Sequence, residues 1–481
     1  MACGNSCLDH DQFAAQDSIL AKGLLVFNSE GGLMTHFPVR ATLATQPLGL
    51  WASLKAARRN LLEILPVLAV KQPMVSGKVG VRWHMVMDPG AIRHMLLDRL
   101  DDYPKSKATK NVLKPAIGNS LFIAEGAEWR WQRRAAAPVF SHRNVTALAP
   151  IMTAAAEDCC WRIDDQSPKA VNLLDEMVRT TFDVIADVTF SSEGGFDVQA
   201  VHKAIDAYIE DAGKISFLDM IGAPDWLPRP GRLFYGSAIG DMKAVADRAI
   251  VSRQNAGARE VPDLLDLLLA GEDPETKRSM DIAELRDNLL TFIVAGHETT
   301  ALSLAWALYL CAFDQDVQDK AREEIKSVCG DNAVTGDDVP NLPYVRMIID
   351  EALRLYPPAG IVSRTAQADD MLCGREIRPG DTVMIPIYAL HRNEALWDEP
   401  DAFLPERFAD RKAIDRYAYL PFGDGPRICI GASFAIQEAV IILATLLGKY
   451  RFTPIKGREP QPVMILTTRP EGGVWLNAEP I

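Results

Sequence analysis

The run Phe422-Gly-Asp-Gly-Pro-Arg-Ile-Cys-Ile-Gly431 is the most informative stretch of this 481-residue chain. It holds one cysteine, Cys429, between glycines, and a helical pattern over residues 432–447 follows it. A cysteine at a helix start feels the positive end of the helix dipole, which favours thiolate. No second Cys or His stands at chelating spacing, so zinc or an iron–sulfur cluster is a poor fit. A lone thiolate suits the axial position of a haem iron; the alternative is a buried, inert cysteine in a glycine-rich turn.

The spacing Phe-x-x-Gly-x-Arg-x-Cys-x-Gly resembles the signature of the cytochrome P-450 (haem-thiolate monooxygenase) family, and every fixed position matches. The resemblance, over residues 80–477, implies a mainly α-helical fold with small β-sheets. Haem b (iron protoporphyrin IX) would lie between a long central helix and the helix after the cysteine loop, with Cys429 bound to iron. It also resembles the branch that includes fatty-acid hydroxylases. We expect residues 51–481 to form one catalytic domain, and assign no structure to residues 1–50.

Composition agrees with one large, acidic domain. Hydrophobic residues make up 48% of the chain, no low-complexity tract divides it, and the net charge is −13. The negative charge argues against nucleic acid as a partner. Eight scattered cysteines indicate a reducing compartment, so we expect a cytoplasmic protein. The apolar stretch 61–70 is too short to span a bilayer, and no membrane span is expected.

The longest helical pattern covers residues 281–313, and its middle is apolar on nearly all faces. Such a pattern predicts a helix buried through the centre of the molecule. Shorter helices are predicted at 53–65, 317–327 and 344–356, and helical patterns dominate 128–254 with a proline-rich break at 224–231. Residues 79–87 read as a strand and 102–126 as an irregular segment. Strands and turns are expected from 357 to the cysteine loop, and strands again over 451–477.

The middle of the long helix holds Ala295-Gly-His-Glu-Thr-Thr300. A threonine hydroxyl inside a helix can bond the carbonyl one turn back and open the helix locally, leaving a pocket for dioxygen and a water. By resemblance this is the oxygen-activation motif, in which Glu298 supplies protons, Thr299 holds the hydrogen bonds around the oxygen, and Ala295 lies beside the cofactor. The alternative, a helix cap, fails because apolar periodicity continues through residues 301–310. We interpret His297 as an ordinary polar residue.

One acid–base network is significant only because of the resemblance. Glu351 and Arg354 lie on one helix face at i, i+3, a spacing common on protein surfaces. In the family this pair and the arginine of Pro-Glu-Arg-Phe, here Arg407, form a buried network that locks the cysteine loop.

Four side chains match the family's haem-propionate ligands. Trp129 and Arg133 stand one helical turn apart, a geometry that can present an indole N–H and a guanidinium to one carboxylate. Arg364 and Arg427 match the other propionate-binding arginines, and Phe422 joins the cofactor contacts.

Apart from the lysine-bearing segment 105–123, the positions that match family substrate contacts are almost wholly apolar, which favours a lipophilic substrate; they include Phe292, Ala359, Ile361 and Val362. A fatty acid, terpenoid or steroid-like compound would gain one oxygen atom from O2. The chain ends 52 residues after Cys429, so we expect two electrons from an external ferredoxin and ferredoxin reductase. The acid-free arginine stretch 130–143 suits docking of that acidic carrier.

Two alternatives remain. A haem-thiolate peroxygenase or isomerase would need no electrons, and a haem or lipid-binding protein would not turn over. The intact pair Glu298 and Thr299 argues against both.

Overall fold

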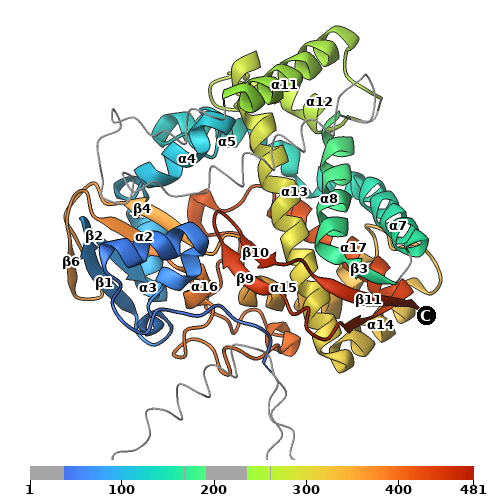
Figure 1. The fold of residues 1–481 in the computed structure, drawn as a ribbon. Coiled ribbons are helices and arrows are strands. Elements are labelled where there is room, and N and C mark those ends of the chain that lie inside the picture. The colour runs from blue at the N-terminus through green and yellow to red at the C-terminus, as the bar shows by residue number, and fades with distance from the viewer. Residues whose placement is uncertain (1–36, 167–168, 191–235, 261) are drawn as a thin grey trace, which may run out of the picture.

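The computed structural model describes residues 37–166, 169–190, 236–260 and 262–481. Its central element is helix α13, Ile282–Phe313, which crosses the middle of the molecule (Figure 1). The helix begins in a capping box, in which Asp281 and Glu284 each accept the other's backbone N–H. Buried residues lie on all of its faces from Leu285 to Ala312. The predicted central helix is therefore confirmed.

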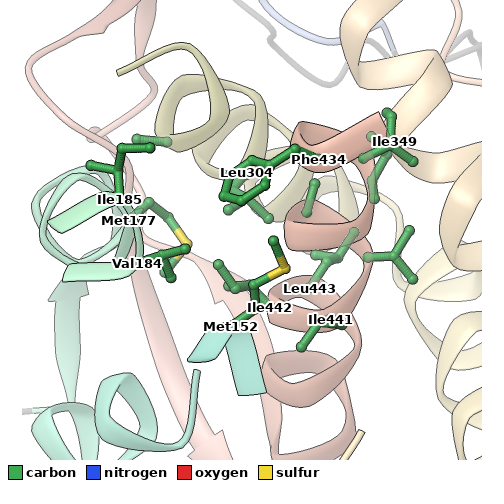
Figure 2. Close-up of a cluster of buried hydrophobic side chains, with 14 of the residues drawn as sticks. Met152, Met177, Val184, Ile185, Leu304, Ile349, Phe434, Ile441, Ile442 and Leu443 are labelled. Atoms are coloured by element: carbon green, nitrogen blue, oxygen red, sulfur yellow. The ribbon is translucent and has the colours of Figure 1, made fainter. Parts of the chain in front are cut away.

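Helices from distant parts of the chain pack around α13 to form the main core. They are α7 (Ala149–Asp165), α8 (Leu173–Phe190), α15 (Pro343–Leu355) and α17 (Ala432–Lys449). Figure 2 shows part of this core, where Leu304 of α13, Ile185 of α8, Met152 of α7 and Ile442 of α17 meet. Burial of this apolar surface is the main force that holds the helices together.

The other helices lie around this core. They are α2 (Leu50–Arg59), α3 (Pro89–Arg93), α4 (Lys107–Ile117), α5 (Gly126–Ala136), α6 (His142–Ala147), α11 (Gly236–Ala256), α12 (Leu264–Leu269), α14 (Gln315–Cys329) and α16 (Ile387–Leu390). Short 3₁₀ turns are η1 (Leu61–Ile64), η2 (Val67–Val70), η4 (Leu100–Asp102), η5 (Ala137–Phe140), η7 (Val339–Asn341), η8 (Pro405–Phe408) and η9 (Gly425–Arg427). A π-helical segment, η3 (His94–Asp98), continues α3.

A four-stranded sheet lies to one side of α13 (Figure 1). Its strand order is β1 (Met74–Val79), β2 (Val81–Val86), β7 (Thr382–Ile385) and β4 (Val362–Thr365). Only the β2–β7 pair is parallel. The smaller sheets are β5 (Asp370–Leu372) with β6 (Arg375–Ile377), β9 (Gln461–Met464) with β10 (Thr468–Glu471), and β3 (Ala170–Asn172) with β11 (Trp475–Pro480) and β8 (Tyr450–Pro454). The mainly α-helical fold with small sheets is confirmed.

Local chemistry explains where the predicted elements differ. Residues 102–126, expected to be irregular, contain α4, because Ser106 accepts the backbone N–H of Thr109 and starts a helix. The helix expected at 53–65 divides at Asn60, whose extended backbone ends α2 and whose side chain caps η1. Strand β1 was not predicted. The proline-rich break at 224–231 and the first 36 residues lie outside the described residues.

Among the described residues one helix, α17, is long and apolar enough to cross a membrane. Of this 18-residue helix 61% is buried inside the protein. Because it packs against α7 and α13, its apolar character is explained by the core.

Candidate active site

The cysteine loop is closed by a backbone bond across it. The N–H of Cys429 donates to the carbonyl of Phe422 at 2.9 Å. Gly425 has a φ of 70°, and a Cβ there would lie 2.4 Å from the carbonyl oxygen of Leu96. Only glycine tolerates both the conformation and this approach. The loop is thus held against η3, and Cys429 stands just before α17, as predicted.

The thiol of Cys429 reaches accessible surface although protein surrounds it closely. Burial raises the pKa of Cys429, while the N–H of Gly431 and the charge of Arg133 oppose that rise. The helix start was expected to lower the pKa of Cys429 and favour the thiolate, but the effect of burial is larger. A metal ion deprotonates a coordinating thiol outright, so iron binding would supply the missing preference.

The middle of α13 presents accessible surface within an otherwise buried helix. Ala295 is exposed and Thr299 is half-buried, and the hydroxyl of Thr299 donates to the carbonyl of Ala295 at 2.7 Å. This is the expected bond to the preceding turn. However, the helix is continuous from Ile282 to Phe313, so the expected local opening is absent.

Glu298 is buried and is bound by the C-terminal hairpin, which consists of strands β9 and β10 and the turn between them. Its Oε1 accepts from the hydroxyl of Thr467 at 2.8 Å and from Nε of Arg469 at 2.7 Å. Both partners were missed from the sequence because they stand 169 and 171 residues away. His297 is buried and its Nδ1 bonds the carbonyl of Ile293 at 2.9 Å, in keeping with a structural role.

Several cations gather around one carboxylate, Glu125. Arg427 forms an ion pair with Glu125, donates to the carbonyl of Ala124 at 2.8 Å and lies 4.1 Å above the ring of Trp129. Lys110 lies 3.3 Å from the same carboxylate. The N–H of Lys105 donates to it at 3.0 Å. We call Lys105, Lys110, Arg364 and Arg427, with Glu125, the cation cluster.

The cation cluster has more buried positive charge than Glu125 can neutralise. Burial lowers the pKa of Arg364 to about 10, and the nearby charge of Arg427 adds to the effect. Burial, with Arg427 and Arg364, also holds the pKa of Lys105 well below its usual value. The Nε of Arg364 is buried and has no hydrogen-bond partner among the described residues.

A buried guanidinium nitrogen without a hydrogen-bond partner is costly unless an anion joins it. The two propionate groups of haem are anions of the right kind. A cavity of about 310 Å³ lined by Glu125, Trp129 and Arg427 opens beside the cluster. Burial lowers the pKa of Arg133, and the charge of Cys429 opposes this effect. Arg133 therefore lies near the site as well. The residues present therefore fit a haem.

The charge network of Glu351, Arg354 and Arg407 is assembled in the structure. Arg354 binds Glu351 through two bonds of 2.6 and 2.8 Å, and Nε of Arg407 donates to Glu351 at 3.0 Å. Arg354 is fully buried and also donates to three carbonyls, those of His391, Pro400 and Ala402.

His391 links this network to the cysteine loop and was missed from the sequence. Its Nε2 accepts from the N–H of Leu420 at 2.9 Å, two residues before Phe422. Its Nδ1 lies 3.2 Å from the carbonyl of Arg354. Burial, followed by the charge of Arg354, lowers the pKa of His391 to about 3. The imidazole is therefore neutral and is held between Arg354 of the charge network and Leu420 at the start of the cysteine loop.

The apolar positions proposed for substrate divide into two places. Ala359 is exposed and Ile361 and Val362 are half-buried, and Val362 begins the strand that holds Arg364. Phe292 is buried on α13 and its ring packs edge-to-face on Phe140, with 5.1 Å between centroids. That ring is therefore part of the packing between α13 and η5.

The arginine stretch 130–143 is less positive than its sequence suggests. Arg134 binds the buried Asp273 at 2.6 Å and Glu275 at 3.2 Å, and Arg130 pairs with the exposed Asp101 at 3.0 Å. The acidic partners come from other parts of the chain, so a local count of charges could not reveal them.

Comparison with known proteins gives consistent matches along almost the whole chain. Residues 49–478 match the family model described as Cytochrome P450. Cyclooctatin synthase of Streptomyces melanosporofaciens is 31% identical over 439 residues, covering 90% of this chain and 94% of that protein. The cyclooctat-9-en-7-ol 5-monooxygenase of the same organism is 32% identical over 406 residues, covering 83% and 86%. The crystal structure of the cytochrome P450DA heme domain superimposes with a TM-score of 0.75 at 27% identity, covering 85% of this chain and 90% of that chain.

Proposed function

The chain belongs to the cytochrome P450 family, and from this premise we propose that residues 51–481 form a haem b monooxygenase domain that hydroxylates a lipophilic substrate. The family implies haem iron, O2, a substrate and an external source of electrons. The observation that carries the assignment of the site is the accessible Cys429 sulfur together with the cation cluster. The Cys429 sulfur offers a ligand for iron, and the cation cluster offers charged partners for the two haem propionates.

Each residue then has a physical task. Haem, when bound, supplies the reduction and cleavage of O2. Cys429 provides the sulfur ligand, and the glycine-rich loop with Phe422 holds that sulfur in place. Arg364, Arg427 and Trp129, with Arg133, would hold the propionates. Glu351, Arg354 and Arg407 would keep the loop fixed through His391, without contact to the substrate.

Glu298 and Thr299 would move protons to the reaction centre from adjacent positions on α13. The hydroxyl of Thr299 now donates to Ala295, and a change of its side-chain rotamer would direct that proton into the site. Both described bonds to Glu298 fall on Oε1, which leaves Oε2 for another partner. The accessible surface at Ala295 gives room beside this pair.

The substrate is proposed to be lipophilic because the strip from Ala359 to Val362 offers only aliphatic side chains and backbone. One relative is named for its action on cyclooctat-9-en-7-ol. A terpenoid, fatty acid or steroid-like compound is the proposed class. We also propose a cytoplasmic location and a ferredoxin-type carrier as electron donor.

Spectroscopy and turnover test the assignment in sequence. The purified protein with haem should show the thiolate-type carbon monoxide spectrum, and Cys429→Ala should lose it. A library screened for displacement of the haem-bound water would supply a substrate. With ferredoxin, ferredoxin reductase and NAD(P)H under oxygen, that substrate should gain one oxygen atom. Product from peroxide alone, and none from the electron-transfer chain, would instead establish a peroxygenase.

A further inference from the structure

A serine, a histidine and an aspartate meet at the far edge of the four-stranded sheet. Ser76 of β1 and His84 of β2 are direct cross-strand partners, and the Ser76 hydroxyl lies 2.8 Å from Nδ1 of His84. On the other side of the ring, Nε2 lies 3.1 Å from Oδ2 of Asp381. Strand β1 forms one edge of this sheet, and β4, which holds Arg364, forms the other. This place is therefore separate from the proposed haem site.

The partners of the imidazole fix its protonation. The carboxylate of Asp381 only accepts hydrogen bonds, so Nε2 of His84 carries the proton. Nδ1 is then the base, with its lone pair towards the hydroxyl of Ser76. Burial lowers the pKa of His84, so the ring is neutral and able to take a proton. A serine beside a base that a third group orients has the arrangement of an activated nucleophile.

Asp381 is itself held in position. Its Oδ2 also accepts the N–H of Arg378 at 2.9 Å and lies 3.3 Å from Arg82. Both His84 and Asp381 are buried, whereas Ser76 is half-buried. The orienting groups are thus rigid, and the hydroxyl is the accessible member.

Ser76 lies in a wide, open depression of the surface, with a volume of about 450 Å³ and a positive lining. The charged residues that line it are Lys78, Arg82, Arg375 and Glu376, and of the three cations Arg82 is already paired with Asp381. Positive side chains around a nucleophile stabilise the negative oxygen that develops during acyl transfer, and they attract an anionic substrate.

We propose that Ser76, His84 and Asp381 form a second, hydrolytic site that cleaves esters bearing a carboxylate. The Ser76 oxygen would bond to the acyl carbon as its proton passes to Nδ1 of His84. The bond from that carbon to the alcohol oxygen would break, and the leaving alcohol would take this proton. A water, deprotonated by the same nitrogen, would then attack the acyl-serine, release the carboxylic acid and return the proton to Ser76.

Covalent labelling of the haem-loaded, full-length protein tests the nucleophile. A fluorophosphonate should label Ser76 with loss of fluoride, as located by peptide mass spectrometry. Ser76→Ala should remove the label, and Asp381→Asn and His84→Gln should slow labelling by about 100-fold. Ser53→Ala is the matched control, because Ser53 is also half-buried but donates only to a backbone carbonyl. The carbon monoxide spectrum of each variant reports that it has folded.

Hydrolysis of two p-nitrophenyl esters tests the positive lining. Above its rate without protein, the monoester of terephthalic acid, whose rigid ring keeps the carboxylate away from its own ester, should be hydrolysed at least about tenfold faster than the neutral benzoate ester, a difference of about 1.4 kcal/mol. Lys78→Ala with Arg375→Ala should abolish that preference, with a larger loss of rate on the charged ester than on the neutral ester. Labelling or hydrolysis that persists in Ser76→Ala, or wild-type protein that reacts no faster than Ser76→Ala, would overturn the proposal.

Discussion

Arg469 holds Glu298 from the C-terminal hairpin, with 2.7 Å between Nε of the arginine and Oε1 of the carboxylate. Glu298 is buried in α13, while the Arg469 side chain is 36% exposed. The pair therefore joins the proposed proton donor to the protein surface. Movement of the guanidinium towards solvent would free Oε1 of Glu298 for Thr299.

Removing Arg469 should leave a buried carboxylate without its countercharge. We expect Arg469→Ala to lower thermal stability and to reduce product formed per electron consumed, while Arg469→Lys retains part of both. A double-mutant cycle with Glu298→Gln should give a coupling energy of about 1–2 kcal/mol in unfolding. A coupling near zero, with unaltered product yield, would show that the pair has no role in proton supply.

Replacing Thr299, the residue after Glu298, should separate electron consumption from product formation. Thr299→Ala is expected to retain haem and to consume NAD(P)H, but to release reduced oxygen as peroxide rather than product. Ser303→Ala is the matched control, since Ser303 makes the same bond one turn later, to the carbonyl of Thr299 at 2.8 Å, and is buried. Full coupling in the Thr299 variant would refute the proposed proton relay.

Arg364→Leu should act in opposite directions with and without haem. Removing a buried guanidinium whose Nε lacks a hydrogen-bond partner should stabilise the haem-free chain. The same change should speed haem loss by about tenfold, because one propionate loses a charged partner worth on the order of 1.4 kcal/mol. Haem transfer to apomyoglobin and denaturant unfolding measure the two effects. Arg378→Leu, at an exposed arginine before β7, should change neither. If haem is lost from both variants at the wild-type rate, Arg364 does not bind a propionate.

His391 should make stability depend on acidity. Its pKa is about 3 in the folded protein and near 6.5 when unfolded, so the unfolded chain binds this proton more tightly. The contribution of His391 to the free energy of unfolding is complete above pH 6.5 and is lost as pH falls towards 3. The free energy of unfolding then changes by at most about 1.4 kcal/mol per pH unit through this residue.

Replacing His391 with glutamine, which can still donate and accept, should flatten that slope. The unfolding midpoint in urea from pH 7 to 4 measures the difference. His142→Gln, at an exposed histidine, should leave the wild-type slope intact. A His391 variant with the wild-type slope would mean that other groups cause the acid sensitivity.

Substitutions in the Arg130–Asp101 pair should change the binding of the proposed electron carrier in opposite directions. Arg130→Glu should raise the carrier concentration needed for half-maximal turnover several-fold, and Asp101→Asn should lower it, because the second change frees the guanidinium. Both effects should fade at high salt. Insensitivity to both substitutions at low salt would place docking elsewhere on the surface.

Prediction from the sequence succeeded where the pattern is long or the spacing is fixed. Helix α13 was predicted within one residue because apolar residues continue through more than eight turns. The cysteine loop was recognised because its residue spacing matches the family signature. The structure explains one of the fixed glycines, Gly425, which leaves no room for a side chain against Leu96. Glu125, His391 and Arg469 were missed, since each acquires its role from a partner that the fold brings from a remote segment. Helix α4 was missed because Pro115 and three lysines hide its apolar face.

The crowding of positive charge around Glu125 has a consequence for biosynthesis. A newly made chain must bring Lys105, Arg364 and Arg427 together with only Glu125 as a nearby counter-anion, and this step opposes folding. Porphyrin binding removes the opposition and, by mass action, draws the chain into its folded form. In a growing cell, the supply of iron porphyrin would therefore limit how much of this protein accumulates.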